Sequence, residues 1–145
     1  MLIRAANQTD IPRNRELQEQ LSVEESIHGF VAETAEEIAK YQHLLVAEID
    51  GEIIGFVSGG IYVSDGSAVI PEGAKFLEIE NLYVAPPYRK HGTGGGLVDE
   101  LLALGKRESA TYALLYSASK DIHAILRFYE KHEFQSWYVQ MFQKL

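Results

Sequence analysis

Glycine fills four of the five positions from Gly92 to Gly96, immediately before an amphipathic stretch. Each glycine costs up to about 1 kcal/mol inside a helix, so a cluster at a helix start needs a reason. Without Cβ atoms, several main-chain N–H groups can converge on one anion, and the helix end adds about half a positive charge. Arg89 and Lys90 add formal positive charge to an acidic chain. The sequence therefore predicts a pyrophosphate site at residues 89–96.

Two better-known phosphate-binding patterns do not fit this loop. A P-loop would close with Gly-Lys-Ser or Gly-Lys-Thr, which the segment lacks. The dinucleotide fingerprint that starts at Gly92 would need a glycine at the position of Leu97 and an acidic ribose partner, which is not evident. A flexible glycine turn is the remaining alternative, but a strand before the loop and a helix after it favour the anion site.

The strand before this loop changes phase along its length. Leu77 and Ile79 are two residues apart, as are Leu82 and Val84, but the step from Ile79 to Leu82 is three. One inserted residue predicts a β-bulge, whereas the alternative is a strand that ends near Asn81. Main-chain groups freed at a bulge need partners. An extended, amide-bearing ligand such as pantetheine can pair there like an added strand.

The elements that position this site follow from periodicity, caps and turns. An antiparallel front half and later strand–helix–strand crossovers, which require parallel pairing, predict an α/β fold with a mixed sheet. The expected strands are 2–5, 44–49, 52–57, 76–84 and 113–116, with one or two more in 134–142. The expected helices start at Thr9 or Asp10 and cover 35–41, 94–108 and 121–132.

Composition limits the class of protein. The 145 residues, 46% apolar and 23% charged, predict one globular domain over 1–145. No apolar run approaches the ~18 residues of a membrane span, and the N-terminus lacks the apolar core of a signal peptide, so a cytoplasmic location is expected. The absence of cysteine and the spacing of the five histidines predict no metal site. The net charge of −8 argues against nucleic acid and suits a cationic substrate.

With these motifs located, a family resemblance is clear. The segment 79–94, IENLYVAPPYRKHGTG, resembles the acetyl-CoA-binding motif of the GNAT superfamily of N-acetyltransferases. The segment 121–134 is similar to the closing helix of that family, which usually reads Asn-x-x-Ala, then Phe-Tyr, then Lys-x-Gly-Phe. The order of elements matches over nearly the whole chain. The resemblance implies a mixed sheet of six to seven strands, bulged in the fourth and flanked by about four helices.

The same resemblance implies roles for individual residues. Tyr129 would lie near the CoA sulfur as general acid, and Glu80 or Glu78 would act as base, in many relatives through water. The pantetheine arm would lie along Leu82, Tyr83 and Val84. The pyrophosphate would be wrapped by the loop residues Arg89, Lys90, His91, Gly92, Thr93, Gly94 and Gly95.

Two positions depart from the family pattern. Asp121 replaces the usual Asn that touches the CoA arm, and an ionised carboxylate accepts hydrogen bonds but cannot donate one. Glu133 replaces the usual Gly before Phe134, which costs roughly 1 kcal/mol if the position has positive φ. Neither change touches the predicted pyrophosphate loop.

The implied reaction is the attack of an amine on the acetyl-CoA thioester. An amine with a pKa of ~10.4 is almost fully protonated at pH 7, so a carboxylate must relay its proton away. A polyamine, amino sugar or lysine-like amine suits the acidic chain. The alternative is a non-catalytic CoA-binding regulatory or interaction module of the same fold.

Two further segments have patterns that could suggest other roles. Ser117 and Lys120 match the Ser-x-x-Lys of penicillin-binding enzymes, but no Lys-Thr-Gly or Ser-Asp-Asn accompanies them, so that function is rejected. The aromatic segment 137–142 is expected to form core or an edge strand of a homodimer.

Overall fold

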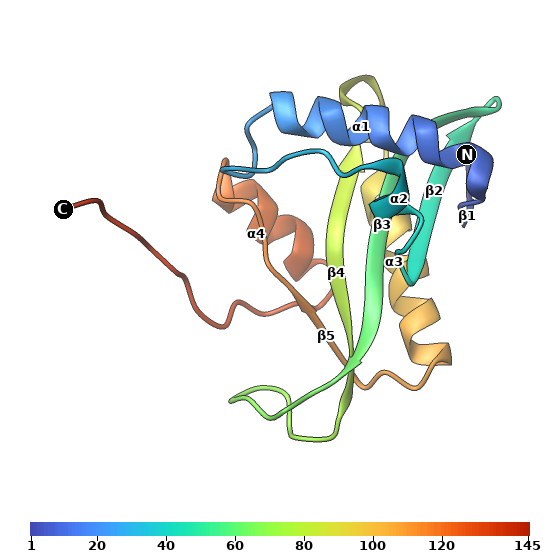
Figure 1. Cartoon of the computed structure of the whole chain (residues 1–145). Coiled ribbons are helices and arrows are strands. Elements are labelled where there is room, and N and C mark those ends of the chain that lie inside the picture. Colours follow the sequence, from blue (N-terminus) through green and yellow to red (C-terminus); the bar gives the residue numbers. More distant parts are fainter.

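A single five-stranded sheet organises the computed structural model, which describes residues 1–145 (Figure 1). The strands follow chain order across the sheet, and the first three pairings are antiparallel whereas β4 and β5 are parallel. The sheet is therefore mixed, as the crossovers in the sequence predicted. Its strands are β1 Leu2–Ala5, β2 His43–Ile49, β3 Glu52–Val63, β4 Lys75–Val84 and β5 Tyr112–Leu115.

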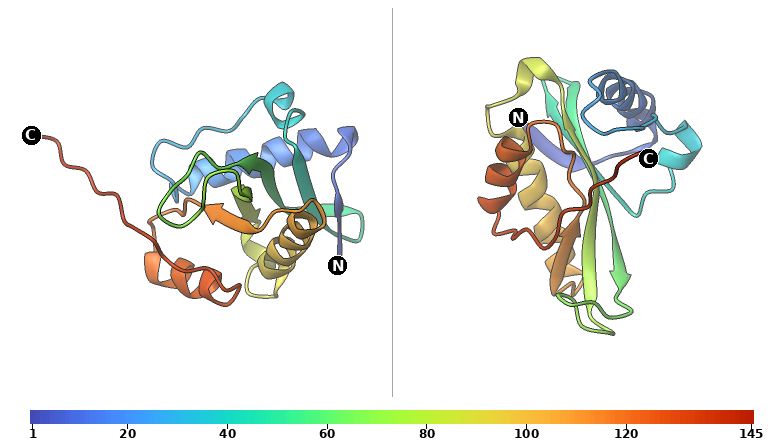
Figure 2. Two further views of the ribbon diagram at one scale, coloured as in Figure 1. Left: turned by 90° about the horizontal axis from the view of Figure 1, so that it is seen from below. Right: turned by 90° about the vertical axis from the view of Figure 1, so that its left-hand side faces the viewer.

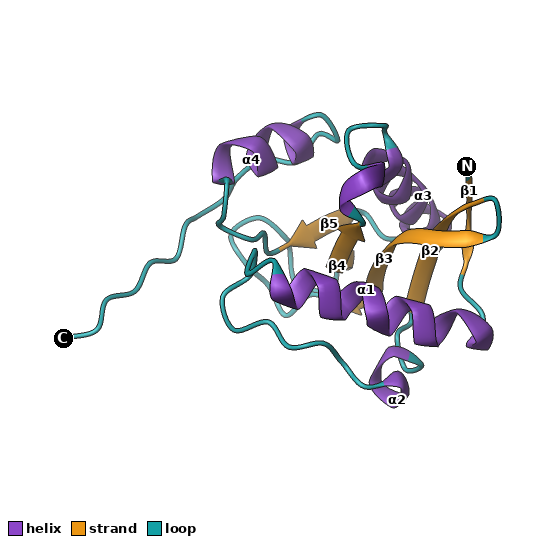
Figure 3. Ribbon diagram, turned by 90° about the horizontal axis from the view of Figure 1, so that it is seen from above, coloured by secondary structure: helices purple, strands orange, loops and turns teal.

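Helices cover both faces of the sheet (Figures 2 and 3). One face carries α1 (Ile11–Val23) and the single turn α2 (Ala35–Ile38), and the other carries α3 (Thr93–Arg107) and α4 (Ile122–Glu130). Leu17 of α1 packs with Phe56 and Tyr83 on the first face. Leu97 and Leu101 of α3 pack on the second, and both are fully buried. The sheet therefore holds α1 and α3 at fixed positions on either side of β4.

The bulge predicted in the fourth strand is present. Along the β3–β4 ladder, Ser58 lies opposite Asn81 and the next residue, Gly59, lies opposite Ile79. Glu80 has no partner on β3, and it is the extra residue that the apolar phase change indicated. The bulge thus puts a carboxylate at the centre of β4.

The strands β4 and β5 share only the first part of β4. Residues 76–79 of β4 pair with 112–115 of β5, and β5 ends there while β4 continues to Val84. The last five residues of β4 therefore have β3 as their only neighbouring strand.

The strand count predicted from the sequence is wrong. The sheet has five strands rather than six to seven, because residues 135–145 form no regular structure and extend away from the body (Figure 1). The segment has the apolar pattern of a strand, but a strand also needs an edge with which to pair. Its aromatic side chains are exposed, from 46% for Trp137 to 88% for Phe142.

Glu133, which stands where the GNAT pattern usually has Gly, has the positive φ that would make glycine favourable at this position. Glu133 has φ of 65° and closes α4, since its N–H donates to the carbonyl of Glu130. Glu133→Gly is therefore expected to raise the free energy of unfolding by about 1 kcal/mol. Urea denaturation measures the change. Lys131→Gly, two residues earlier at φ of −64°, is the matched control and should lower stability by about 0.5–1 kcal/mol. Loss of stability in both variants would contradict the prediction.

Candidate active site

The glycine loop joins the end of β4 to the start of α3. After β4, Pro86–Tyr88 form one 3-10 turn, and the chain then reverses through left-handed conformations at Lys90 (φ 64°) and Gly92 (φ 84°). Gly92 is the N-cap of α3 and offers no side chain to its first turn. Thr93 is buried and points back to the Tyr88 carbonyl at 3.4 Å. The start of α3 is thus left without any internal cap.

Six consecutive main-chain donors in this loop have no acceptor within the protein. None of the N–H groups of residues 90–95 donates a hydrogen bond, and the first bonded amide is that of Gly96, to the Gly92 carbonyl at 2.9 Å. Uncapped helix donors together with the positive end of the helix dipole favour an anion. The geometry can therefore hold a phosphate or pyrophosphate.

The glycines of the loop serve different purposes. A Cβ on Gly96 would lie 2.9 Å from Ile3 Cδ1, so this glycine allows α3 to approach β1 closely. A Cβ on Gly94 would meet Phe128 of α4 at 3.6 Å, and one on Gly95 would meet His132 at 3.5 Å. Both distances are ordinary contacts, so a small side chain would fit there, and only Gly96 is required by a close approach. The candidate anion site comprises residues 90–95.

Arg89 is one of the residues predicted to bind pyrophosphate, but its side chain is paired elsewhere. Its Nε donates to the Val84 carbonyl at 2.7 Å, and its Nη2 donates to both carboxylate oxygens of Glu24, at 2.8 and 2.9 Å. The guanidinium lies 5.2 Å from the centre of the Tyr83 ring. Lys90 and His91, in contrast, are exposed beside the loop.

The free edge of β4 leads from the loop toward the bulge. The Ala85 N–H donates to Ile54 of β3 at 2.9 Å. Main-chain groups alternate along a strand, so those of Leu82 and Val84 face the opposite edge, where β5 has already ended. The Tyr83 side chain is buried against α1 instead. An extended chain of amides could therefore pair with Leu82.

The helix α4 flanks the same space. Asp121 is its N-cap at φ of 56°, and its side chain makes no cap hydrogen bond. Tyr129 lies edge-on to Phe128 and Phe134, with ring centres 4.9 and 5.7 Å away. Burial raises the pKa of Tyr129 to about 12, so its hydroxyl stays protonated at neutral pH.

Carboxylates gather around the bulge on the α1 face of the sheet. Glu80 accepts a hydrogen bond from the Tyr62 hydroxyl at 2.8 Å, and this bond raises the pKa of Tyr62 to about 12. Burial, and next the charge of Glu80, raise the pKa of Glu78. The two carboxylates predicted from the sequence are therefore electrostatic neighbours.

A third carboxylate, Glu33, joins them from the segment between α1 and α2. The buried Gln18 of α1 holds it twice: the Glu33 N–H donates to Gln18 Oε1 at 2.9 Å, and Gln18 Nε2 donates to the Glu33 carboxylate at 3.3 Å. Burial raises the pKa of Glu33, and the charge of Glu80 adds to the shift. No sequence signal marked Glu33 or Glu24, because their partners lie far away along the chain.

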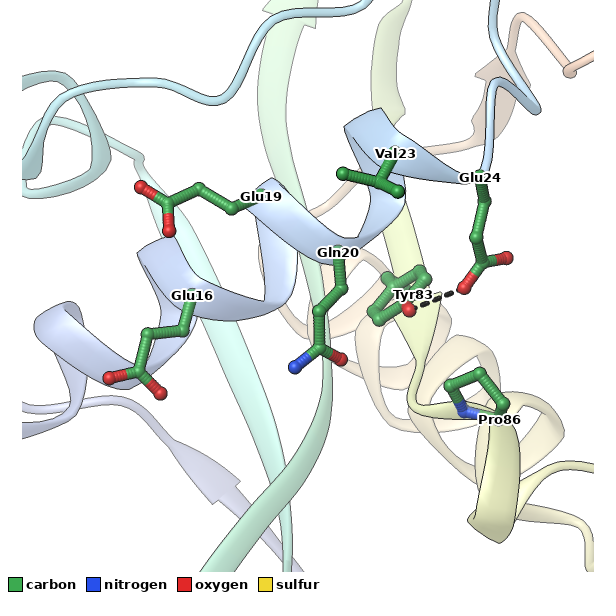
Figure 4. Close-up of a pocket in the computed structure, with 7 residues that line it drawn as sticks. All are labelled: Glu16, Glu19, Gln20, Val23, Glu24, Tyr83 and Pro86. Atoms are coloured by element: carbon green, nitrogen blue, oxygen red, sulfur yellow. Dashed lines mark hydrogen bonds between the residues drawn. The ribbon is translucent and has the colours of Figure 1, made fainter.

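A separate acidic groove of about 630 Å³ lies between α1 and the end of β4 (Figure 4). Glu24 points toward the Tyr83 hydroxyl, which donates to it at 2.6 Å. Burial acts to raise the pKa of Glu24, but the hydrogen bonds from Arg89 and Tyr83 outweigh it and lower the pKa. The groove is lined by Glu16, Glu19, Gln20, Val23, Glu24, Tyr83 and Pro86.

The sequence matches the family model described as "Acetyltransferase (GNAT) family" over residues 11–134. The chain belongs to the GNAT acetyltransferase family. The matched region of this GNAT protein runs from the start of α1 to Phe134, and so includes the glycine loop, the bulge and α4. The sequence matches none of the curated proteins with which it was compared.

Solved structures share the fold of this GNAT protein at low sequence identity. A mutant of the BH1408 protein from Bacillus halodurans has a TM-score of 0.81 at 18% identity, covering 100% of this chain and 99% of that one. A predicted acetyltransferase from Clostridium acetobutylicum, solved with acetyl-CoA, has a TM-score of 0.75 at 18% identity (99% and 95%). The aminoglycoside N-acetyltransferase AAC(6')-Iy, solved with CoA, has a TM-score of 0.73 at 20% identity (99% of both chains). None of the helices in this GNAT protein is both long enough and apolar enough to span a membrane.

The role of Gly92, the left-handed N-cap of α3, in ligand binding can be tested separately from its effect on stability. Gly92→Ala is expected to weaken the binding of CoA at least fivefold, because the strained residue redirects the six donors. Isothermal titration calorimetry measures the affinity. Gly73→Ala is the matched control, since Gly73 also has positive φ (80°) and open space around it, but lies in a distant loop. Both variants should lose about 1 kcal/mol of stability, and an equal loss of CoA affinity in both would contradict the assignment.

Proposed function

We propose that this protein is an acetyl-CoA-dependent N-acetyltransferase that acts on a primary amine carrying additional positive charge. The observation that carries the proposal is the row of six unbonded N–H groups at residues 90–95, connected by the free edge of β4 to the carboxylates of the bulge. A phosphate-bearing ligand with an extended amide chain fits this path from one end to the other.

The residues present fit CoA at each part of the path. The pyrophosphate would bind the N–H groups of 90–95, and the pantetheine amides would pair with the main chain of Leu82 and with the N–H of Val84, whose carbonyl already accepts from Arg89. The arm would pass between β4 and α4, where Asp121 and Tyr129 lie. The CoA and acetyl-CoA bound to the relatives of similar fold support this arrangement.

The bulge carboxylates suit the handling of a protonated amine. Thioester cleavage supplies the acetyl group and a sulfur leaving group. Glu80 is the unpaired residue of the bulge and would remove the proton from the ammonium nitrogen, directly or through water. Its bond from Tyr62 fixes the orientation of one carboxylate oxygen. Glu78 is the alternative base, and its raised pKa brings it closer to the working pH. Tyr129 would donate its hydroxyl proton toward the leaving sulfur.

The charge around the bulge indicates the class of acceptor. Glu33, Glu78 and Glu80 come from two separate segments, and the charge of Glu80 contributes to the raised pKa of both Glu33 and Glu78. A substrate with a second ammonium group would relieve this repulsion, as a polyamine, an amino sugar or a lysine-like amine can. Two of the relatives of similar fold are named as aminoglycoside acetyltransferases, which supports a polycationic acceptor.

The exposed C-terminal segment supports a homodimer. Residues 137–142 present Trp137, Tyr138 and Phe142 to solvent, and β5 has one edge without a strand partner. Large exposed apolar patches in a soluble chain indicate an interface. A second copy that pairs with this segment would cover it.

The acid role of Tyr129 gives a direct activity test. Thiol release from acetyl-CoA is followed across spermidine, an aminoglycoside and a lysine peptide. Tyr129→Phe is expected to lower kcat about 100-fold with CoA affinity unchanged. Tyr112→Phe, a similar change on β5 at the far end of the sheet, should have no effect. Tight CoA binding by the wild type without thiol release on any amine would favour the non-catalytic module.

The base is tested by its pH dependence. A carboxylate base loses activity as it is protonated, so kcat/KM of the wild type should fall as the pH is lowered. Glu80→Gln is expected to reduce kcat/KM about 100-fold and to flatten this acid limb. Glu72→Gln, on an exposed loop, is the control for the change of charge. If Glu78→Gln alone removes the limb, Glu78 is the base instead.

A further inference from the structure

The ion pair between Arg89 and Glu24 joins the CoA loop to the end of α1. Both partners are partly exposed, 39% for the Arg89 side chain and 28% for Glu24, and the guanidinium meets both carboxylate oxygens. Arg89 is also the residue next to the first of the six unbonded donors, the N–H of Lys90. The Arg89 guanidinium, which is next to the candidate anion site in the chain, is therefore already paired with the Glu24 carboxylate.

We infer that the Glu24 carboxylate competes with the phosphates of CoA for the Arg89 guanidinium. By pairing with Arg89, Glu24 would lower the affinity of the protein for CoA. This inference rests on the proposed function, because it takes CoA as the ligand of the loop. A planar guanidinium binds carboxylate and phosphate with the same two-pronged geometry, so one can replace the other. The pyrophosphate carries more charge than the carboxylate and is assisted by six N–H groups that Glu24 does not reach.

The remaining contacts allow this exchange without loss of the fold. The Glu24 main chain is anchored separately, because its carbonyl accepts from Lys120 Nζ at 2.7 Å and its N–H donates to Gln20 at 3.2 Å. Its carboxylate would keep the hydrogen bond from the Tyr83 hydroxyl after Arg89 leaves. Arg89 in turn is held near the end of β4 by the Val84 carbonyl. Both main chains therefore keep their contacts when the two side chains separate.

The competition also selects among ligands. Arg89 is needed only where a phosphate replaces the carboxylate, so pantetheine, which has no pyrophosphate, gains nothing from the removal of Glu24. The effect of Glu24 on binding is thus expected for CoA and absent for pantetheine.

The test compares CoA and pantetheine affinities of the full chain by calorimetry. Glu24→Gln keeps the size of the side chain and its bond to Tyr83 but removes the charge that holds Arg89. It is expected to bind CoA about 2- to 5-fold more tightly than the wild type, which is the upper part of the range of a partly exposed ion pair. Pantetheine affinity should not change. Arg89→Ala should weaken CoA binding, and Glu24→Gln should give no further gain in that background.

Glu19→Gln is the matched control, because Glu19 lines the same groove on α1 but pairs with Arg15 rather than with Arg89. It should change CoA affinity less than twofold. Glu24→Asp provides a second variant that keeps the charge but shortens the reach, and it should also bind CoA more tightly. Equal or weaker CoA binding by Glu24→Gln, with the wild type still binding CoA, would overturn the inference. Failure of the wild type to bind CoA would instead overturn the proposed function.

Discussion

Six main-chain N–H groups without acceptors at the start of α3 impose the constraint on which the rest of the site depends. Such donors are costly to leave unpaired in a folded chain unless a solvent or ligand anion meets them. Two left-handed residues, Lys90 and Gly92, turn the chain at the start of this row of N–H groups. Gly96 lets α3 pack closely against β1. The buried side chains of Leu97 and Leu101 then hold α3 against one face of the sheet.

The second determinant is the combination of a bulge with an early strand end. The bulge at Glu80 changes the phase of β4, so the main-chain groups of Leu82 and Val84 face the side on which β5 has ended. Glu80, which has no partner on β3, follows Glu78 by two positions, and its charge contributes to the raised pKa of Glu78. The proposed pantetheine edge and the proposed base therefore lie next to each other on β4, just beyond the end of β5.

Charge is distributed unevenly between the two ends of this path. The proposed phosphate end combines main-chain donors with Arg89, whose guanidinium is paired with Glu24. The amine end is acidic and is supplied by β4 and by the segment before α2. An anionic co-substrate and a cationic acceptor would therefore be drawn to opposite ends, which keeps each from the other's site.

The sequence by itself determined the features that are local in the chain. The glycine loop and the phase change of β4 are each encoded within about ten residues, and the structure contains both. Only the tertiary structure decided the contacts that join distant segments. It placed Glu24 on Arg89, 65 residues away, and Gln18 on Glu33, and it left residues 135–145 without the partner strand that their pattern suggested. Periodicity records which face of an element is apolar, whereas pairing depends on what the rest of the chain brings alongside it.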